Sequence, residues 1–186
     1  RGVRRLLADI EALAPAGERG RLDRDQRVGA HYDPAIGRHT APFLMAAINV
    51  PVVRRSNALL GYPYGRDFRY DERVVVAGPW SARVVSGGLR ALPVLAALGP
   101  TRALLRRLAP RPGGGPSLEQ RARGRFEVQT FDASDGAPAV ATRCIVGAEL
   151  DPGYVATARM LAQSALCLPL HDLPGHAGLL TPASRM

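Results

Sequence analysis

The spacing of apolar residues predicts an amphipathic helix over 3–14, because these residues recur there at intervals of three and four. Residues 16–40 are polar and contain several turn-forming residues, so we expect a long loop with one short extended piece. We interpret 1–40 as the start of a domain, an N-terminal helix and a long loop, and 41–186 as its main body.

Helical spacing returns between Ala41 and Gly61, where a proline interrupts it. Pro51 lacks a backbone N–H group and disfavours a continuous helix. It is well suited to the first turn of a new helix, and Asn49 is a good capping residue for such a turn. We therefore expect two helical pieces with a kink at 49–51, the second of which ends at Gly61.

A strand is predicted within 67–78, where aromatic and charged residues alternate before a run of valines. Two helical stretches, 82–98 and 100–110, follow it and are separated by a Gly-Pro pair. Glycines and prolines stand at the beginning of the segment 111–124, which we expect to open with a flexible loop.

The second half of the chain begins with a predicted hairpin. Residues 125–134 alternate between apolar and polar side chains, and a turn sequence separates them from a second strand pattern at 139–150. Asp151 as a cap and Pro152 in the first turn start a helix over 151–168, whose apolar residues indicate that it is largely buried. This order is typical of an α+β fold, with helices packed on one face of a mainly antiparallel sheet.

The net charge of +9 results from 25 basic residues, all of them arginine, against 16 acidic residues. Such a charge attracts acidic partners, an anionic membrane or a carrier protein among them, and salt weakens the attraction. Because the arginines are spread along the chain, no specific nucleic-acid module is indicated. The two cysteines are typical of core residues in a reducing compartment, and no apolar run reaches the roughly 20 residues of a membrane span. We expect a cytoplasmic protein and leave association with a membrane surface open.

The motifs of a self-contained enzyme are missing. The sequence has no GxGxxG, P-loop, HExxH, GxSxG or CxxC. His171, Asp172 and His176 form the best cluster of metal-ligand residues, but a further well-placed ligand is lacking, so no metal site is predicted. The first residue is not methionine, and we expect that the chain is cut from a longer polypeptide.

Three consecutive polar residues, Arg54, Arg55 and Ser56, are candidates for binding an anion or substrate. Neighbouring side chains on a helix point about 100° apart, so these three cannot all face one ligand. We expect one arginine to reach a phosphate or an acidic partner and the other to pair within the protein.

Tyr64 and Tyr70 are the catalytic candidates, because a phenol can donate a proton or stabilise an oxyanion in a reduction; a packing role stays open for both. A second candidate anion site consists of the backbone N–H groups of Gly153 and Tyr154 at a helix start, provided that Asp151 does not occupy them.

Four blocks of the sequence resemble one family. They read APFLMAAINVPVVRRSNALLGYPYGRDFRYDE, GGGPSLEQRARGRFEVQTF, ELDPGYVATARMLAQSALCL and GLLTPASRM. Together they extend from Ala41 to Met186 and resemble the C-terminal half of the bacterial saccharopine dehydrogenase-like oxidoreductases. The most similar branch is that of the trans-acting enoyl reductases of actinobacterial polyketide lipid synthesis. Pro51 departs from the first block.

The resemblance implies a two-domain oxidoreductase with an N-terminal Rossmann domain that binds NAD or NADP. This chain would be its C-terminal α+β substrate domain, and no cofactor site is then expected within it. The implied activity is hydride transfer from NADPH to the double bond of an enoyl thioester on an acyl carrier protein. Carrier proteins are acidic, which agrees with the net charge of +9. The resemblance assigns no catalytic residue.

A non-catalytic role is the alternative. The chain would then be a binding module that docks an acidic carrier protein or an acyl chain, or a dimerisation module that forms a homodimer through its sheet. Non-specific binding of nucleic acid through net charge is a third, weaker hypothesis.

Overall fold

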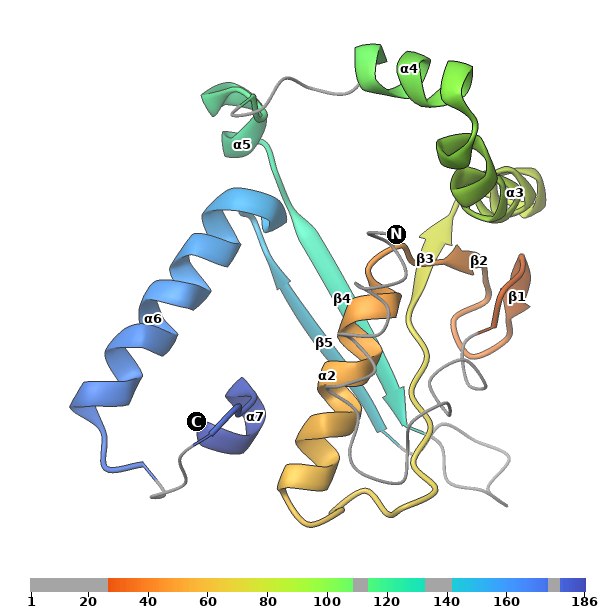
Figure 1. Cartoon of the computed structure of the whole chain (residues 1–186). Coiled ribbons are helices and arrows are strands. Elements are labelled where there is room, and N and C mark those ends of the chain that lie inside the picture. The colour runs from red at the N-terminus through yellow and green to blue at the C-terminus, as the bar shows by residue number, and fades with distance from the viewer. Residues whose placement is uncertain (1–26, 109–113, 133–141, 174–177) are drawn as a thin grey trace. The chain divides into compact units, whose positions relative to one another are not determined.

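The computed structural model describes residues 27–108, 114–132, 142–173 and 178–186. Helices and antiparallel sheets are mixed in it, which confirms the α+β class (Figure 1). The chain forms two units: one comprises residues up to Leu105 and from Pro174 onward, and the other extends from Arg106 to Leu173. The helix predicted over 3–14 lies outside the described residues, and the division at residue 40 stays a prediction.

The first unit contains a three-stranded antiparallel sheet of β1 (His31–Asp33), β2 (Arg38–Pro42) and β3 (Arg73–Val76), in that order. The Asp33 carboxylate accepts a hydrogen bond from the Ala35 N–H at 3.0 Å, and Gly37 adopts a φ of 63°. These two residues close a hairpin turn, because aspartate bonds to the backbone two residues on and glycine accepts positive φ. Within 16–40 the sequence predicted one short extended piece, whereas β1 and the beginning of β2 both lie there; residues 16–26 lie outside the described residues.

Helix α2 spans Ala46–Leu59 without interruption and includes Pro51. The prediction of two helical pieces was wrong. Pro51 removes one backbone hydrogen bond, but its ring is buried beside Val50, which is 1% exposed, and this packing offsets the loss. Asn49 does not cap a helix, since its side-chain amide donates to Glu72 Oε2 at 2.9 Å.

Helix α3 (Pro79–Ala97) packs against β2 through small residues, with Ala82 at 0% and Ser86 at 6% exposure. Helix α4 (Gly99–Leu108) follows directly, so the two helices predicted here are confirmed. The predicted strand over 67–78 pairs only at β3, because the preceding residues contact side chains of α2 instead of a neighbouring strand. None of the described helices is long and apolar enough to cross a membrane.

The second unit contains the predicted hairpin of β4 (Phe126–Asp132) and β5 (Thr142–Ala148), which pair in antiparallel register. A short helix, α5 (Leu118–Ala122), lies in the later part of the segment 111–124, after the predicted opening loop. Its start has a capping box: the Ser117 hydroxyl accepts from the Gln120 N–H, and the Gln120 side chain accepts from the Ser117 N–H.

Helix α6 (Thr157–Leu170) follows a π-helical turn, η1 (Pro152–Ala156), and ends the second unit. The predicted cap is confirmed, because the Asp151 carboxylate accepts from the Tyr154 N–H at 2.5 Å. Gly124 fits directly against this turn: a Cβ atom there would lie 2.5 Å from the Asp151 Cα.

The second unit leaves most of its apolar side chains uncovered. Among its described residues Ala156 is buried, at 5% exposure, whereas α6, β4 and β5 contain no buried residue. The expectations that α6 is largely buried and that Cys144 is a core residue were therefore wrong. A two-stranded ribbon is marginally stable in water. Contact of its exposed apolar side chains with further protein surface would therefore stabilise this unit.

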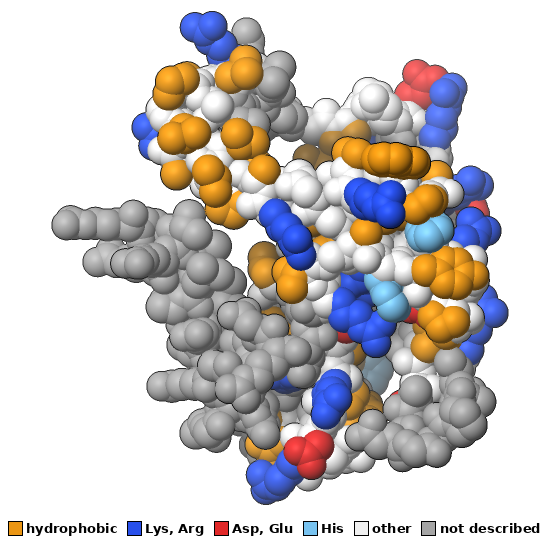
Figure 2. All heavy atoms as spheres, turned by 90° about the vertical axis from the view of Figure 1, so that its right-hand side faces the viewer, with side chains coloured by type: hydrophobic (Ala, Val, Ile, Leu, Met, Phe, Trp, Pro, Cys, Tyr) orange, Lys and Arg blue, Asp and Glu red, His pale blue; other side chains and the backbone are white. Residues whose placement is uncertain are grey.

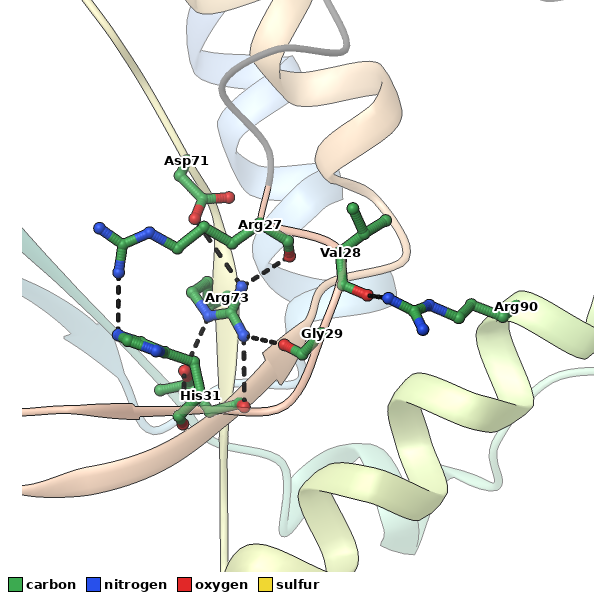
Figure 3. A network of polar contacts seen from close by, with 8 residues as sticks. Arg27, Val28, Gly29, His31, Asp71, Arg73 and Arg90 are labelled. Atoms are coloured by element: carbon green, nitrogen blue, oxygen red, sulfur yellow. Dashed lines mark hydrogen bonds and ion pairs between the residues drawn. The ribbon is translucent and has the colours of Figure 1, made fainter.

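A single guanidinium group ties the sheet of the first unit to the preceding chain (Figure 3). Arg73 donates to the Thr40 hydroxyl at 2.7 Å, to the Arg27 carbonyl at 2.7 Å, and to the carbonyls of Gly29 and Thr40. Its side chain is 9% exposed and lies 3.8 Å from the Asp71 carboxylate. The planar fork of arginine can satisfy several acceptors at once, which explains how one side chain anchors three residues.

Burial is the main cause of the pKa shifts of Arg73 and Asp71. Desolvation lowers the pKa of Arg73 and raises the pKa of Asp71, although the guanidinium attracts the carboxylate and opposes the second shift. At 3.8 Å the ion pair is long, so the attraction does not outweigh the loss of water. The hydrogen bonds to carbonyl groups, more than the ion pair, therefore hold Arg73 in place.

Two further arginine contacts complete the anchor of this segment. Arg90 on α3 donates to the Val28 carbonyl at 2.6 Å, and Arg27 lies 2.9 Å from His31 Nε2 (Figure 3). The backbone carbonyls of three consecutive residues, Arg27 to Gly29, thus all accept from arginine.

Arg73→Lys keeps the positive charge but replaces the forked donor by a point donor, so most of the carbonyl contacts are lost. We expect the free energy of unfolding, measured by urea denaturation, to fall by about 2–3 kcal/mol. Arg69→Lys, at an exposed position, is the matched control and should change it by less than about 0.5 kcal/mol. Equal effects of the two substitutions would contradict the anchoring role of Arg73.

Candidate functional site

Three polar side chains of the first unit meet where the segment before β3 passes α2, and we call them the Glu72 cluster: Asn49, Tyr70 and Glu72. The Tyr70 hydroxyl donates to Glu72 Oε1 at 2.9 Å, and the Asn49 amide donates to Glu72 Oε2 at 2.9 Å. Both carboxylate oxygens thus accept from neutral donors, and the cluster is partly buried. Negative charge is therefore held in place beside α2 by hydrogen bonds.

Tyr70 is a weaker acid here than a tyrosine in water. Burial raises its pKa, and the hydrogen bond to Glu72 and the negative charge of that carboxylate raise it further. The phenol therefore keeps its proton at physiological pH and serves as a hydrogen-bond donor. A direct proton transfer from Tyr70 to a substrate would first require that it release Glu72.

An aromatic row leads away from the cluster and consists of Tyr64, Phe68 and Tyr70. The rings of Tyr64 and Phe68 lie 5.2 Å apart between centroids, and those of Phe68 and Tyr70 lie 6.4 Å apart. Tyr64 is 63% exposed, so its ring and hydroxyl are accessible from solvent. The row places an apolar surface next to a fixed carboxylate, a combination that suits a ligand with both apolar and polar parts.

The turn that carries the aromatic row is held by Asn57. Its side chain accepts from the Tyr64 N–H at 3.1 Å and donates to the Gly65 carbonyl at 2.9 Å. Tyr62 adopts a φ of 65°, a conformation that is costly for a residue with a side chain, and Arg66 stacks over its ring at 4.3 Å. A strained residue in an over-determined turn is a frequent feature of functional sites.

The three candidates on α2, Arg54, Arg55 and Ser56, point in different directions and make different contacts. Arg54 is buried at 7% exposure, whereas Arg55 is partly exposed and donates to the Leu179 carbonyl at 3.1 and 2.7 Å. The Ser56 hydroxyl lies 2.8 Å from the Thr181 hydroxyl. Arg55 and Ser56 thus attach the C-terminal segment and its helix α7 (Pro182–Arg185) to α2.

One of the two N–H groups of the second candidate anion site is occupied from within the chain. Asp151 already accepts from the Tyr154 N–H, so this group is not available to an external anion. The Tyr154 ring is covered by the Arg121 guanidinium at 4.5 Å, which gives the side chain a packing role. Gly153 and Tyr154 therefore lie at a capped helix start, and the arrangement offers no argument for anion binding there.

No cluster of metal-ligand side chains occurs in the part of the chain that the structure describes. His171 follows α6, whereas His176 lies outside the described residues, so the spacing noted in the sequence cannot be followed in space.

Two members of the Glu72 cluster, Asn49 and Glu72, were not predicted from the sequence as site residues. Asn49 was interpreted as a cap and Glu72 was not singled out, although Tyr70 and Glu72 are two residues apart in an extended segment. Side chains at that spacing point to the same side of an extended chain, which is the signal that could have paired them. Nothing in the sequence indicated that Asn49, 23 residues away, would complete the cluster.

Proteins named trans-acting enoyl reductase are similar to nearly the whole of this chain. One from Mycobacterium tuberculosis, which has the name provisionally, is 38% identical in an alignment of 210 residues with gaps included. The alignment covers 99% of this chain and 47% of that protein. One from Mycobacterium leprae is 36% identical and covers 97% of this chain and 44% of its own length. One from Mycobacterium ulcerans is 35% identical, with 88% and 41% covered.

The chain spans about half the length of the curated relatives it matches. No protein-family model matches the chain, and no solved structure matches it. The chain thus has homologues named trans-acting enoyl reductase at 33–38% identity.

Tyr70→Phe should reduce the loss of stability at alkaline pH. An unfolded tyrosine ionises near its ordinary pKa of 10.0, whereas folded Tyr70 keeps its proton to a higher pH. The parent chain therefore loses unfolding free energy as the pH rises above 10.0, and Tyr70→Phe should lose less. At neutral pH the variant should be about 1 kcal/mol less stable, because one hydrogen bond is gone.

Tyr64→Phe, at a position 63% exposed, is the control for Tyr70→Phe. It should change neither the stability at neutral pH nor the loss of stability at alkaline pH. Urea denaturation at neutral pH and across the alkaline range measures both quantities. An equal alkaline slope in Tyr70→Phe and the parent chain would contradict the raised pKa of Tyr70.

Arg54→Ala and Arg55→Ala should differ in their effect on the free energy of unfolding. Loss of the buried Arg54 side chain should lower it by about 3 kcal/mol, and loss of the Arg55 contact to one carbonyl by about 1 kcal/mol. Thermal or urea denaturation of the two variants checks this order. Equal losses would show that the two side chains do not occupy different environments.

Proposed function

We propose that this chain is the C-terminal substrate half of a trans-acting enoyl reductase of the saccharopine dehydrogenase-like type. The observation that carries the proposal is the similarity along 99% of this chain to 47% of a longer protein of that name. The upstream half would be a Rossmann domain that binds NADP or NAD, since this chain has no GxGxxG fingerprint.

The proposed reaction saturates a carbon–carbon double bond conjugated to a thioester. When bound, the coenzyme supplies a hydride to the β-carbon of the enoyl group. The electron pair of the double bond moves toward the thioester oxygen, and the α-carbon then takes a proton. The protein must therefore supply a donor near the developing oxyanion and a proton source near the α-carbon.

Tyr64 and Tyr70 are the phenols proposed for these tasks. Tyr64 is 63% exposed, so a substrate could reach its hydroxyl without displacing another side chain. Tyr70 donates to Glu72, and this contact fixes one end of the aromatic row on which Tyr64 rests. We therefore assign substrate contact to Tyr64 and a positioning role to Tyr70.

The acyl group would be presented as a thioester on an acyl carrier protein. An acidic carrier would be attracted by the net charge of +9, an effect that acts on the rate of encounter and weakens with salt. The exposed aromatic row offers apolar area to the acyl chain.

The test is reduction of an enoyl thioester, followed by the loss of NADPH absorbance, with the chain extended upstream by its native sequence. We expect activity and NADPH binding in the extended protein and neither in the 186-residue chain. Tyr64→Phe in the extended protein should lower kcat about 100-fold. Glu119→Gln, on the exposed helix α5, is the control and should leave kcat unchanged.

Two results would overturn the proposal. Tight NADPH binding by the 186-residue chain would mean that the coenzyme site lies within it. Absence of NADPH binding by the extended protein would favour the non-catalytic module, a role that the uncovered apolar side chains of the second unit also fit.

A further inference from the structure

Helix α3 has two faces of opposite character. The face toward the sheet carries small residues, of which Ala82 and Ser86 are buried. The opposite face carries four large apolar side chains that are 75, 71, 62 and 52% exposed, and we call them the outer row: Trp80, Val84, Val94 and Leu98. Eighteen residues make about five helical turns, so the first and last members lie on the same side of the helix.

The second half of α3 is apolar in every direction. Residues 91–98 contain no polar side chain, and each of them is exposed. Contiguous apolar surface of this kind is rare on monomeric proteins and marks a site of interaction. Something apolar must therefore cover the outer row if this surface is to be stable in water.

The charged side chains of α3 and α4 are of one sign. Five arginines and no acidic residue occur from Pro79 to Leu108. Arg83 and Arg90 are seven residues apart and flank one side of the outer row, and Arg102 follows it on α4. The Arg83 guanidinium lies 5.2 Å from the centre of the Trp80 ring. The partner must therefore be apolar at its centre and negatively charged at its edge.

Figure 2 faces the side of the molecule on which α3 lies in Figure 1. In its upper part hydrophobic side chains gather, and arginine side chains lie among them. On the same helix Leu92 and Leu95 are 40 and 39% exposed, so the outer row is not the whole of the apolar surface of α3.

A second copy of this chain is a poor occupant. Two α3 helices packed face to face about a two-fold axis would place Arg83 and Arg90 of both copies along one edge. The stretch from Arg73 to Leu118 offers no acidic residue to pair with them, so like charges would oppose the contact. A specific protein partner would also need directional polar contacts, which residues 91–98 do not offer.

We propose that the outer row of α3 binds an anionic phospholipid membrane surface, with the helix axis in the plane of the membrane. Valine, leucine and the Trp80 ring enter the boundary between headgroups and acyl chains, and Arg83 and Arg102 contact lipid phosphates. The apolar stretch 91–98 is about 12 Å long, too short to cross a hydrocarbon core of about 30 Å, but sufficient for burial at the interface.

This binding is independent of the proposed reductase activity, because no residue of the outer row belongs to the Glu72 cluster or the aromatic row. It supplies a reason for the uncovered apolar surface and for the absence of acidic residues from α3 and α4. A protein bound in this way would meet acyl substrates at the surface of a membrane.

The experiment is flotation of the 186-residue chain with vesicles of phosphatidylcholine and with vesicles of equal parts phosphatidylcholine and phosphatidylglycerol. We expect strong binding to the anionic vesicles, weakened by salt, and weak binding to the neutral ones. Trp80 is the sole tryptophan, so its fluorescence emission should shift to shorter wavelength when the chain binds.

Three variants locate the contact. Val94→Asp should abolish binding, while Arg83→Gln and Arg102→Gln should each weaken it about fivefold, which corresponds to about 1 kcal/mol per arginine near an anionic surface. All three positions are exposed, so the urea midpoint should not change. Leu118→Asp, at a position 81% exposed, and Arg69→Gln are the matched controls and should bind as the parent does.

Several outcomes would overturn the proposal. Unchanged binding of Val94→Asp, equal binding to neutral and anionic vesicles, or an unchanged Trp80 emission would each contradict a contact made by the outer row. Absence of vesicle binding would also contradict the proposal if sedimentation velocity instead showed a dimer that Val94→Asp abolishes. A complex with an acidic carrier protein that Val94→Asp abolishes would have the same meaning.

Discussion

The sheet of the first unit depends on the buried guanidinium group of Arg73. Its strands have three, five and four residues, so their ladders contain few backbone hydrogen bonds. Arg73 adds bonds from β3 to β2 and to the carbonyls of the segment before β1, which the ladders alone do not connect. A charged group can occupy such a position only because almost every direction around it offers an acceptor.

The position of the Glu72 cluster follows from this anchor. Glu72 directly precedes Arg73, so the guanidinium that fixes the start of β3 also fixes the carboxylate beside α2. Asn49 then links the carboxylate to the helix, and the turn held by Asn57 continues the same helix. A perturbation at Arg73 is therefore expected to reach the aromatic row through covalent connection and two amide side chains.

Local signals in the sequence sufficed for part of this structure. Asp151 followed by Pro152 predicted a capped helix start, and the alternation in β4 predicted the hairpin, because both depend on neighbouring residues. Pro51 was misinterpreted, since the packing of its ring against the interior is a tertiary effect that outweighs local propensity. Turn-forming residues were recognised between Asp33 and Gly37, but the hairpin of β1 and β2 was not predicted, because such short strands have almost no periodicity.

The candidate site was predictable only in part, for a similar reason. Tyr64 and Tyr70 could be chosen by residue type, but the contact that raises the pKa of Tyr70 involves Glu72, and the contact that fixes Glu72 involves α2. Arg54 and Arg55 differ in environment as helical geometry requires, yet which of the two is buried depends on the packing of α2. Pairings over such distances are properties of the fold.

The two faces of α3 also set a spacing. One face of the helix lies on β2 and the other carries the outer row, so anything that covers the outer row is separated from the sheet by the thickness of one helix, about 10 Å. Because α3 is additionally tied to the Val28 carbonyl through Arg90, it cannot rotate about its own axis without breaking that bond. The helix therefore acts as a spacer of fixed thickness and fixed orientation between the sheet and whatever surface it meets.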